Sequence, residues 1–361
     1  HWQHVYHNAG IVLDDNPYIV VILTNEGYDN YITYEYVYMT FNSECQTVYK
    51  KIVQSIEHHK NLDYQKVDFA DKLMICEIDL SEFEINSEDI AICFWGILSD
   101  HTEYFFVCDT VYYYLDKETG EKFLYVMASD ECGDRQIREE VYGKLNRVVE
   151  EIKIQVSEME STAEKVRYID EYIRKNFTYA SVSEDIPEVN DITSSVASIL
   201  EGRAICAGYA RMNHFVLNHL GINTIYVTGM VDEGYHAWNY IFVEEENQWY
   251  ASDVTFSDGG EKILLRGNDI LKTHKPLKEG LTDDGFGYPL PELSGEDFIF
   301  DNDQTEESGE SVNGDGDTDT NFENDDTDNK NDSSEGIQDE LKDELVNAFG
   351  GEENIVNVQN E

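Results

Sequence analysis

Basic residues are scarce in this sequence of 361 residues. The chain holds 25 Lys and Arg against 75 Asp and Glu, which gives it a formal net charge of −50. Binding to duplex nucleic acid requires clustered Lys and Arg side chains that neutralise phosphates. We therefore expect no nucleic-acid partner for this protein.

Long apolar runs and paired cysteine motifs are also missing. No stretch of 18 or more consecutive apolar residues occurs, so we expect no membrane-spanning segment in this chain. The six cysteines occur singly without a CxxC pair, and we therefore expect no metal site. The chain begins at His1 without a signal-peptide pattern, which we interpret as a processed form or a piece excised from a longer protein. Buried thiols are favoured over disulfides for five cysteines: Cys45, Cys76, Cys93, Cys108 and Cys132.

The first 130 residues alternate strand-like and helical patterns, and we predict that they form a smaller N-terminal α+β region. The apolar spacing predicts helices over 46–60 and 86–98 and extended chain over 18–23, 31–41, 66–80, 104–115 and 122–128. This region shows no catalytic motif of its own.

Residues 131–300 are predicted to form a catalytic domain. Apolar stripes at helical spacing predict long helices over 134–160 and from Ser161 onward, where Ser161 and Glu164 have the spacing of a capping box. A further helix is expected from Cys206 to about Leu220, followed by three strands over 224–231, 236–243 and 248–256.

The last 61 residues differ in composition from the rest. Residues 301–361 contain 21 acidic residues against two Lys and hardly any apolar ones. Such a segment cannot bury enough surface to offset the conformational entropy lost on folding. We therefore predict an acidic low-complexity tail that is disordered.

Cys206 stands among small residues at the predicted start of a helix, in the run Gly202–Ala210. A cysteine at a helix N-terminus gains thiolate character because the unpaired N–H groups and the helix dipole favour negative charge there. The backbone N–H of the same residue points toward any oxyanion that forms on an attacked carbonyl. Taken alone, a small buried cysteine is the more common explanation of such a residue.

His236 and Asp253 favour a reactive Cys206 over a merely buried one. A hairpin turn centred between Glu244 and Glu245 would place positions 236 and 253 opposite each other on antiparallel strands, with their side chains on one face. A carboxylate there can orient an imidazole, which in turn can take the thiol proton. Cys206, His236 and Asp253 are therefore predicted to form a catalytic triad.

The segment from Glu164 to Gly260 resembles the transglutaminase-like superfamily, which has a papain-related Cys-His-Asp fold. The residues that carry the resemblance are Gly202–Ala210, His236–Asn239 and Trp249–Tyr250 followed by Asp253–Thr255. The match is nearest to bacterial members that have an extra N-terminal region. The resemblance implies an α+β fold in which a helix bearing the Cys packs on an antiparallel sheet bearing the His and Asp.

The resemblance also implies a function. Cys206 would attack an amide or ester carbonyl and form a thioester, with His236 as base and Asp253 as the residue that orients it. The substrate would be a protein or peptide, and no cofactor is required by this chemistry. We further expect substrate-pocket or supporting roles for four neighbouring residues: Trp238, Asn239, Tyr209 and Gly208.

Three functions stay open at this point. Water can resolve the thioester, which gives a peptidase or amidase, and we favour this outcome because water is always present. A lysine amine can resolve it instead, which gives a protein-glutamine cross-linking enzyme. A binding or scaffold module at a cell surface that retains the fold without catalysis is the third. The acidic tail and the resemblance lead us to expect an extracellular or cell-surface location.

Overall fold

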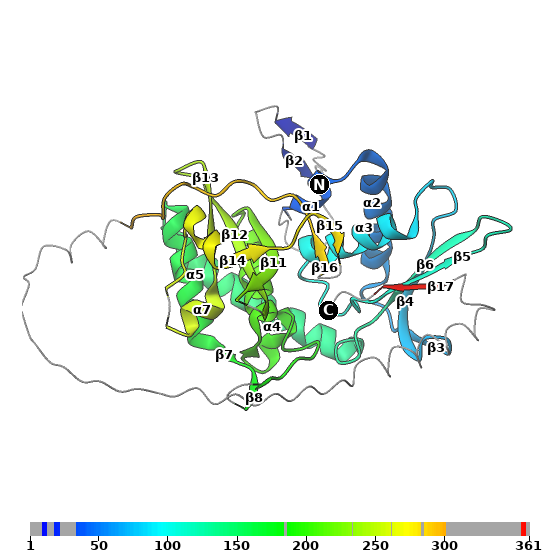
Figure 1. Ribbon diagram of the computed structural model, residues 1–361. Helices are drawn as coiled ribbons and strands as arrows, with labels where there is room; N and C mark the ends of the chain where they lie inside the picture. Colours follow the sequence, from blue (N-terminus) through cyan, green and yellow to red (C-terminus); the bar gives the residue numbers. More distant parts are fainter. Residues whose placement is uncertain are drawn as a thin grey trace, which may run out of the picture.

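The computed structural model describes residues 9–12, 18–21, 34–183, 186–232, 234–260, 262–282, 285–300 and 355–358. Two sheets organise this part of the chain. Figure 1 shows strands β3–β6 with helices α2 and α3 toward one end of the molecule, and strands β11–β14 with helices α5 and α7 toward the other. The predicted combination of a Cys-bearing helix and an antiparallel sheet within an α+β fold is confirmed.

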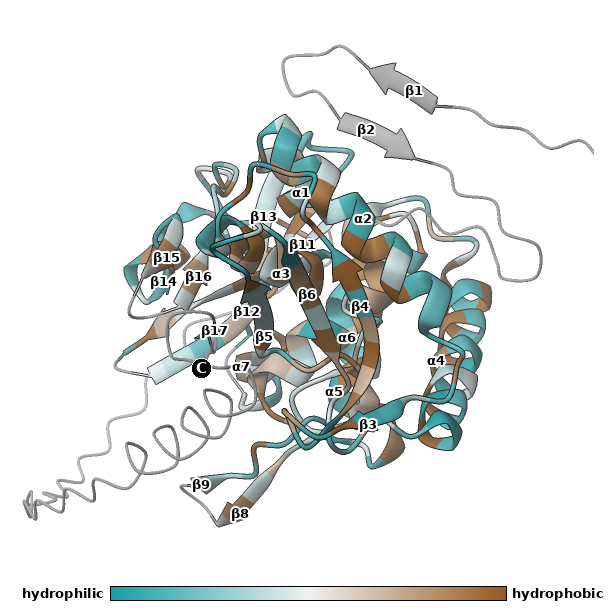
Figure 2. Ribbon diagram, turned by 90° about the vertical axis from the view of Figure 1, so that its right-hand side faces the viewer, coloured by the Kyte–Doolittle hydropathy of each residue, from teal (hydrophilic) through white to brown (hydrophobic). Residues whose placement is uncertain are grey.

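The first sheet belongs to the N-terminal region and has the strand order β17-β5-β6-β4-β3. Its strands are β3 (Gln65–Val67), β4 (Lys72–Asp79), β5 (Val111–Leu115), β6 (Lys122–Met127) and the C-terminal β17 (Ile355–Val358). Figure 2 shows β4 and β6 mainly in brown, and residues such as Ile78, Leu124 and Val126 on them are buried. Strand β5 is shorter than the predicted 104–115, because residues 104–109 form turns with a single bridge from Val107 to Ala128.

Helices α1 (Tyr36–Thr40), α2 (Ser43–His59) and α3 (Ser87–Asp100) accompany this sheet. The prediction of a strand over 31–41 is wrong for the described residues 34–41, where α1 forms instead. The cause is a contact distant in sequence. The two carboxylate oxygens of Asp100, at the end of α3, accept hydrogen bonds from the backbone N–H groups of Val37 and Tyr38, each at 2.9 Å. A buried carboxylate thus caps the first turn of α1 and overrides the strand propensity of its tyrosines.

Two long helices lead into the second half of the chain: α4 (Arg135–Val156) and α5 (Thr162–Asn176). Ser161 caps α5 as predicted, because its hydroxyl accepts a hydrogen bond from the backbone N–H of Glu164. The reciprocal carboxylate, however, is supplied by Glu245, at the turn of a distant hairpin. Glu245 accepts hydrogen bonds from the Ser161 hydroxyl at 2.6 Å and from the backbone N–H groups of Thr162 and Ala163. The start of α5 is thereby fixed to the second sheet.

The second sheet has the strand order β13-β12-β11-β14 and carries the residues of interest. Its strands are β11 (Thr224–Val231), β12 (Gly234–Val243), β13 (Gln248–Ser252) and β14 (His274–Pro276). All three strand pairs are antiparallel. Helix α6 (Cys206–His219) packs on β11 and β12, and the short helix α7 (Val254–Asp258) follows β13 directly.

The predicted hairpin register is wrong by two residues. Val243 pairs with Gln248 and Asn239 pairs with Ser252, so the turn is centred between Glu245 and Glu246. The third predicted strand also ends early, because the ladder stops at Ser252 and Asp253 becomes the N-cap of α7. A shift of two keeps every side chain on its predicted face, which is why the two triad partners still meet.

The remaining described elements are short. They are the strands β1 (Ala9–Val12), β2 (Tyr18–Val21), β7 (Thr178–Tyr179), β8 (Ser181–Ser183), β9 (Ile186–Pro187), β10 (Arg203–Ala204), β15 (Gly280–Thr282) and β16 (Gly285–Gly287), and the 3-10 turns η1 (Val196–Leu200) and η2 (Asn268–Lys272). The tail predicted as disordered, residues 301–361, lies outside the described residues except for β17.

A continuous hydrophobic core joins the two sheets, with members from Val37 in α1 to Phe300. The predicted domain boundary near residue 130 stays a prediction. Five of the six cysteines are buried thiols, and only Cys206 is partly exposed. None of the helices in the described part of the chain has both the length and the apolar composition needed to cross a membrane.

Candidate active site

Cys206 is the first residue of α6, and its side chain is partly exposed. The preceding residue, Ile205, provides no side-chain cap for the helix, and the first turn contains no acidic residue. The N–H groups at this end of α6 are therefore left to other acceptors, and the positive end of the helix dipole lies next to the sulfur. A negatively charged sulfur or oxyanion is favoured at this position.

His236 and Asp253 lie side by side at the ends of β12 and β13. Oδ2 of Asp253 accepts a hydrogen bond from Nε2 of His236 at 2.6 Å. Its other oxygen, Oδ1, accepts from the backbone N–H of Phe256 at 3.1 Å, so that Asp253 both caps α7 and orients the imidazole. Asp253 is fully buried, and the His236 side chain is 10% exposed. The geometry leaves Nδ1 of His236 as the nitrogen available to Cys206.

The pKa values of the pair reflect these contacts. Burial lowers the pKa of His236, but the hydrogen bond to Asp253, the hydrogen bond to Cys206 and the charges of both outweigh it and raise that pKa to about 9. Burial raises the pKa of Asp253, but hydrogen bonds from His236 and from a second histidine, His274, bring the net pKa below its ordinary value. The carboxylate is therefore ionised, and the imidazole binds a proton readily.

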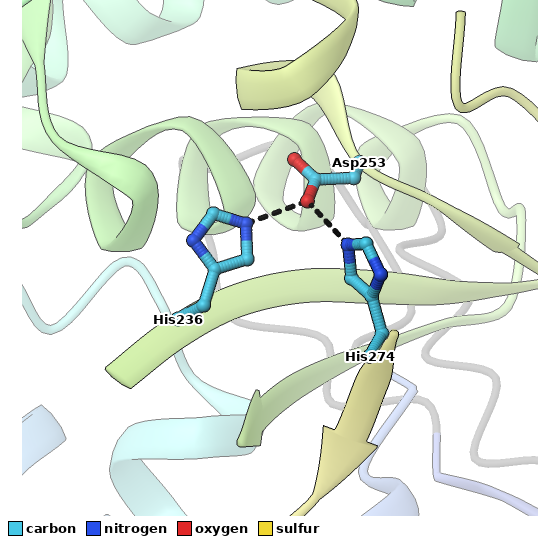
Figure 3. Close-up of side chains that lie close together, drawn as sticks. All are labelled: His236, Asp253 and His274. Atoms are coloured by element: carbon cyan, nitrogen blue, oxygen red, sulfur yellow. Dashed lines mark hydrogen bonds and ion pairs between the residues drawn. The ribbon is translucent and has the colours of Figure 1, made fainter. Parts of the chain in front are cut away.

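His274, on β14, was not singled out by the sequence. Figure 3 shows its ring and that of His236 pointing at the same oxygen of Asp253. Nε2 of His274 lies 3.0 Å from Oδ2, and the side chain is 2% exposed. No sequence motif marks this residue. Strand β14 reaches the site only by pairing with β11, after residues 259–273, in which η2 is the one named element. A lone histidine beside Pro276 carries no recognisable pattern.

Aromatic rings enclose the two histidines. Trp238 stacks near His236 with ring centroids 6.2 Å apart and meets His274 edge-on at 5.2 Å. Phe256 contacts both rings edge-on, at 5.2 and 5.5 Å. These rings exclude water from the buried side of the hydrogen bonds, which strengthens them. Trp238 thus supports the predicted triad from within the core, and its indole N–H has no hydrogen-bond partner among the described residues.

The other three predicted neighbours lie away from the open side of the site. Asn239 is fully buried, donates to the backbone O of Ala210 at 3.0 Å and thereby ties α6 to the sheet. The Tyr209 hydroxyl donates to Asp258 at 2.8 Å, which joins α6 to α7. Gly208 touches the backbone O of Thr193 so closely that an added Cβ would collide with it. None of these three, nor Trp238, lines the cleft described next. Their contacts join α6 to the elements around it, and their roles toward a substrate stay predictions.

A cleft of about 620 Å³ opens over Cys206 and His236. The N-terminal region forms one of its walls with α3 and the loop that follows, through Trp95, Leu98 and Asp109. The indole N–H of Trp95 donates to the backbone O of Asp109 at 2.8 Å, which fixes this wall. Other lining residues are Tyr179, Arg211, Tyr226, Tyr235, Leu277 and Phe286. The cleft is large enough for several residues of an extended peptide.

Tyr179 lies near Cys206 and also lines the cleft. Burial raises the pKa of its hydroxyl, and the nearby Cys206 adds to that effect.

Three groups of the kind that bind metals meet at the site. The relevant atoms of His236, Asp253 and His274 all lie within 4.8 Å of one another. Their closest separations, 2.6 and 3.0 Å, are those of hydrogen bonds. Ligand atoms around tetrahedral zinc, at bond lengths of about 2.0 Å, are separated by roughly 3.3 Å. The cluster as it stands is a hydrogen-bonded unit.

Residues 150–254 match the family model of the transglutaminase-like superfamily. This match contains Cys206, His236 and Asp253, and it agrees with the arrangement of α6, β12 and β13. This segment is therefore similar to the transglutaminase-like superfamily, as the sequence motifs predict. No curated protein sequence matches the chain.

Several solved structures are similar to part of the chain. One is a TGase, with a TM-score of 0.29 and 16% identity over 38% of this chain and 41% of that chain. Another is a candidate cysteine protease from Cytophaga hutchinsonii, with a TM-score of 0.25 and 14% identity over 51% of this chain and 83% of that chain. A third is the periplasmic domain of TgpA from Pseudomonas aeruginosa, with a TM-score of 0.25 and 17% identity over 38% of this chain and 57% of that chain. The match thus spans less than two thirds of the TGase and TgpA chains.

Proposed function

We propose that the protein is a cysteine-dependent acyl-transfer enzyme that acts on amide bonds of proteins or peptides. The observation that carries this proposal is the position of Cys206. It is the one partly exposed cysteine of the described chain, and it starts a helix in a cleft where His236 and the ionised Asp253 form a hydrogen-bonded pair. A thiol, a base and a group that orients the base are the parts that nucleophilic acyl transfer requires.

The proposed reaction has two halves. In the first, His236 takes the proton of the Cys206 thiol, and the thiolate attacks the amide carbonyl carbon. The C–N bond then breaks, the nitrogen leaves with the proton from His236, and a thioester remains on Cys206. In the second half, His236 takes a proton from water, the hydroxide attacks the thioester, and the acid product leaves as the thiol is restored. Asp253 keeps its charge throughout and stabilises the imidazolium.

The start of α6 would stabilise the negative oxygen of each tetrahedral intermediate. The backbone N–H of Cys206 and its neighbours have no side-chain cap. Such preorganised N–H groups cost nothing to reorient at the moment of reaction. No cofactor takes part in this scheme.

We favour hydrolysis over cross-linking because the second half needs only water. A cross-linking enzyme would use a lysine amine in place of that water and would form an isopeptide bond. We also propose that residues 131–300 act as the catalytic domain, with the N-terminal region as a cleft wall, and that the protein works outside the cell or on its surface. Protease shaving of intact cells tests this location.

Labelling of Cys206 tests the nucleophile. Iodoacetamide at mildly acidic pH should alkylate Cys206 faster than a free thiol peptide, and the Cys206→Ala variant should fold but take up no label at this rate. The five buried thiols provide the internal control, because they should stay unlabelled until the protein unfolds. Alkylation of Cys206 at the rate of the free peptide would contradict the proposal.

Incubation with a peptide library, with and without an amine donor, separates the two outcomes of the thioester. Hydrolysis gives shortened or deamidated peptides in both mixtures, as judged by mass spectrometry. Cross-linking gives peptides that lose ammonia and gain the mass of the donor. The Cys206→Ala variant must show neither product.

A further inference from the structure

We propose that His274 is a positioning residue of this site, which donates a second hydrogen bond to the Asp253 carboxylate and limits the basicity of His236. The inference rests on the proposed function, since it assigns a role within the same site. Its basis is the shared acceptor: one oxygen of Asp253 receives both imidazole rings, at 2.6 and 3.0 Å (Figure 3).

His274 must be the donor in its hydrogen bond with Asp253. An ionised carboxylate has no proton to give, so Nε2 of His274 must carry the proton of its hydrogen bond with Oδ2. On the other side of the ring, Nδ1 lies 3.0 Å from the hydroxyl of Thr273, which also lies 3.1 Å from the backbone O of Ile270. Whichever partner this hydroxyl donates to, Nε2 of His274 donates to Asp253.

The backbone brings His274 to this position by a specific contact. Strand β14 pairs with the end of β11, where Gly229 faces Pro276 and Val231 faces His274. Gly229 allows this approach, because a Cβ there would collide with the backbone O of Lys275 and lie 2.6 Å from the ring of Trp238. A strand held this tightly fixes the ring of His274, and the ring in turn fixes the carboxylate.

A second donor on the same oxygen changes the chemistry of His236. It stabilises the charge of a carboxylate that is fully buried, and burial of an unpaired charge would otherwise be costly. It also shares the electron density of Oδ2, so that less of the carboxylate charge acts on His236. A proton held too strongly by His236 would be slow to pass to the leaving amine.

Other charged groups around the cluster are few. Cys206 faces His236 from α6. Asp170 faces Asp253 from α5, where Arg174 forms an ion pair with it at 2.8 Å. These groups are unchanged in the variants below, so a shift in the protonation of His236 reports on His274.

Two variants that differ by one methylene provide the test. The amide nitrogen of His274→Gln reaches the place of Nε2 and can donate to Asp253, whereas that of His274→Asn reaches only the place of Nδ1. The full-length protein is alkylated with iodoacetate, whose negative charge favours a thiolate beside an imidazolium. The rate therefore falls at high pH when His236 loses its proton, and the midpoint of this fall is the measured quantity.

We expect the midpoint to rise by about half to one pH unit in His274→Asn, since Asp253 then acts on His236 alone, and to stay near the wild-type value in His274→Gln. Thermal unfolding of each variant separates this effect from a loss of stability. If His274→Asn does not fold, His274→Leu takes its place, and its midpoint is compared with those of wild type and His274→Gln at low temperature. The midpoint should again be higher in the variant that lacks the donor. Equal midpoints in folded variants that lack the donor would overturn the inference while leaving the proposed function intact. Wild-type Cys206 that reacts like a free thiol, with no fall at high pH, would overturn the proposed function itself.

Discussion

Replacement of Asp253 by Asn should remove most of the proton affinity of His236. The side chain keeps its size but loses its charge, so the imidazolium loses the larger of the two partners, Asp253 and Cys206, that oppose the effect of burial on its pKa. The pKa of His236 is about 9 against an ordinary 6.5, and this difference corresponds to roughly 3 kcal/mol of stabilisation of the charged ring. Because the His236 side chain is only 10% exposed, solvent screening reduces this value little.

The size of the effect on reactivity follows from the two pKa values. At pH 8 a pKa of about 9 leaves roughly nine-tenths of His236 charged, whereas a pKa of about 6.5 leaves roughly 3%. Iodoacetate alkylation of Cys206 at pH 8, followed by peptide mass spectrometry, should therefore be about 30-fold slower in Asp253→Asn than in the wild type. The midpoint of the high-pH fall should move from about 9 to 6.5 or below.

The stability of the folded protein should depend on the protonation of His236. The pKa of His236 is higher in the folded state than in the unfolded state, so its contribution is complete below about pH 6.5 and is lost as the pH rises through about 9. Thermal unfolding of the wild type should lose this contribution across that window, and Asp253→Asn should not show the loss. The matched control is Asp269→Asn, at an exposed ion pair with Lys272. A midpoint that stays near pH 9 in Asp253→Asn would refute the assignment of Asp253 as the partner of His236.

Two further substitutions test the scaffold. Gly229→Ala places a Cβ against the backbone O of Lys275 and should lower the free energy of unfolding by about 1–3 kcal/mol in urea titrations; an unchanged urea midpoint would show that β14 can move away without cost. Glu245→Gln weakens the cap of α5 and should cost about 0.5–2 kcal/mol at pH 7. Desolvation raises the pKa of Glu245, but hydrogen bonds from Ala163 and Ser161 outweigh it and lower that pKa to about 2. The difference in unfolding free energy between wild type and Glu245→Gln should therefore be complete above about pH 4.5 and should vanish as the pH falls toward 2. A difference that persists at pH 2 would contradict this reasoning.

Local signals in the sequence predicted the helices well, because their caps lie next to them. Asn86, Asp134 and Ser161 each accept hydrogen bonds from the first turn of the helix that they were expected to start. The helix from Cys206 to about Leu220 begins and ends as expected, and Gly221, which has a positive φ, follows it. These elements depend on residues within four or five positions of one another.

Contacts between distant segments were beyond the reach of the sequence. The tyrosine-rich stretch at 34–41 has strand propensity, but Asp100 converts it into α1 from 62 and 63 residues away. The predicted hairpin register was wrong by two residues. The turn after Val243 can be centred at 244/245 or at 245/246, and both registers put the same side chains on the same face, so the alternation of side chains alone does not distinguish them. His274 was missed for the same reason, since only the pairing of β14 with β11 brings it to Asp253.

The wall that α3 contributes to the cleft has an evolutionary consequence. Cys206, His236 and Asp253 lie within the segment 150–254 that matches the family, whereas Trp95, Leu98 and Asp109 lie well outside it. For the proposed enzyme, selection can therefore alter what the cleft accepts by changing α3 and its loop, while Cys206, His236 and Asp253 stay as they are. Two segments of the chain, one inside the family match and one outside it, thus meet at one surface.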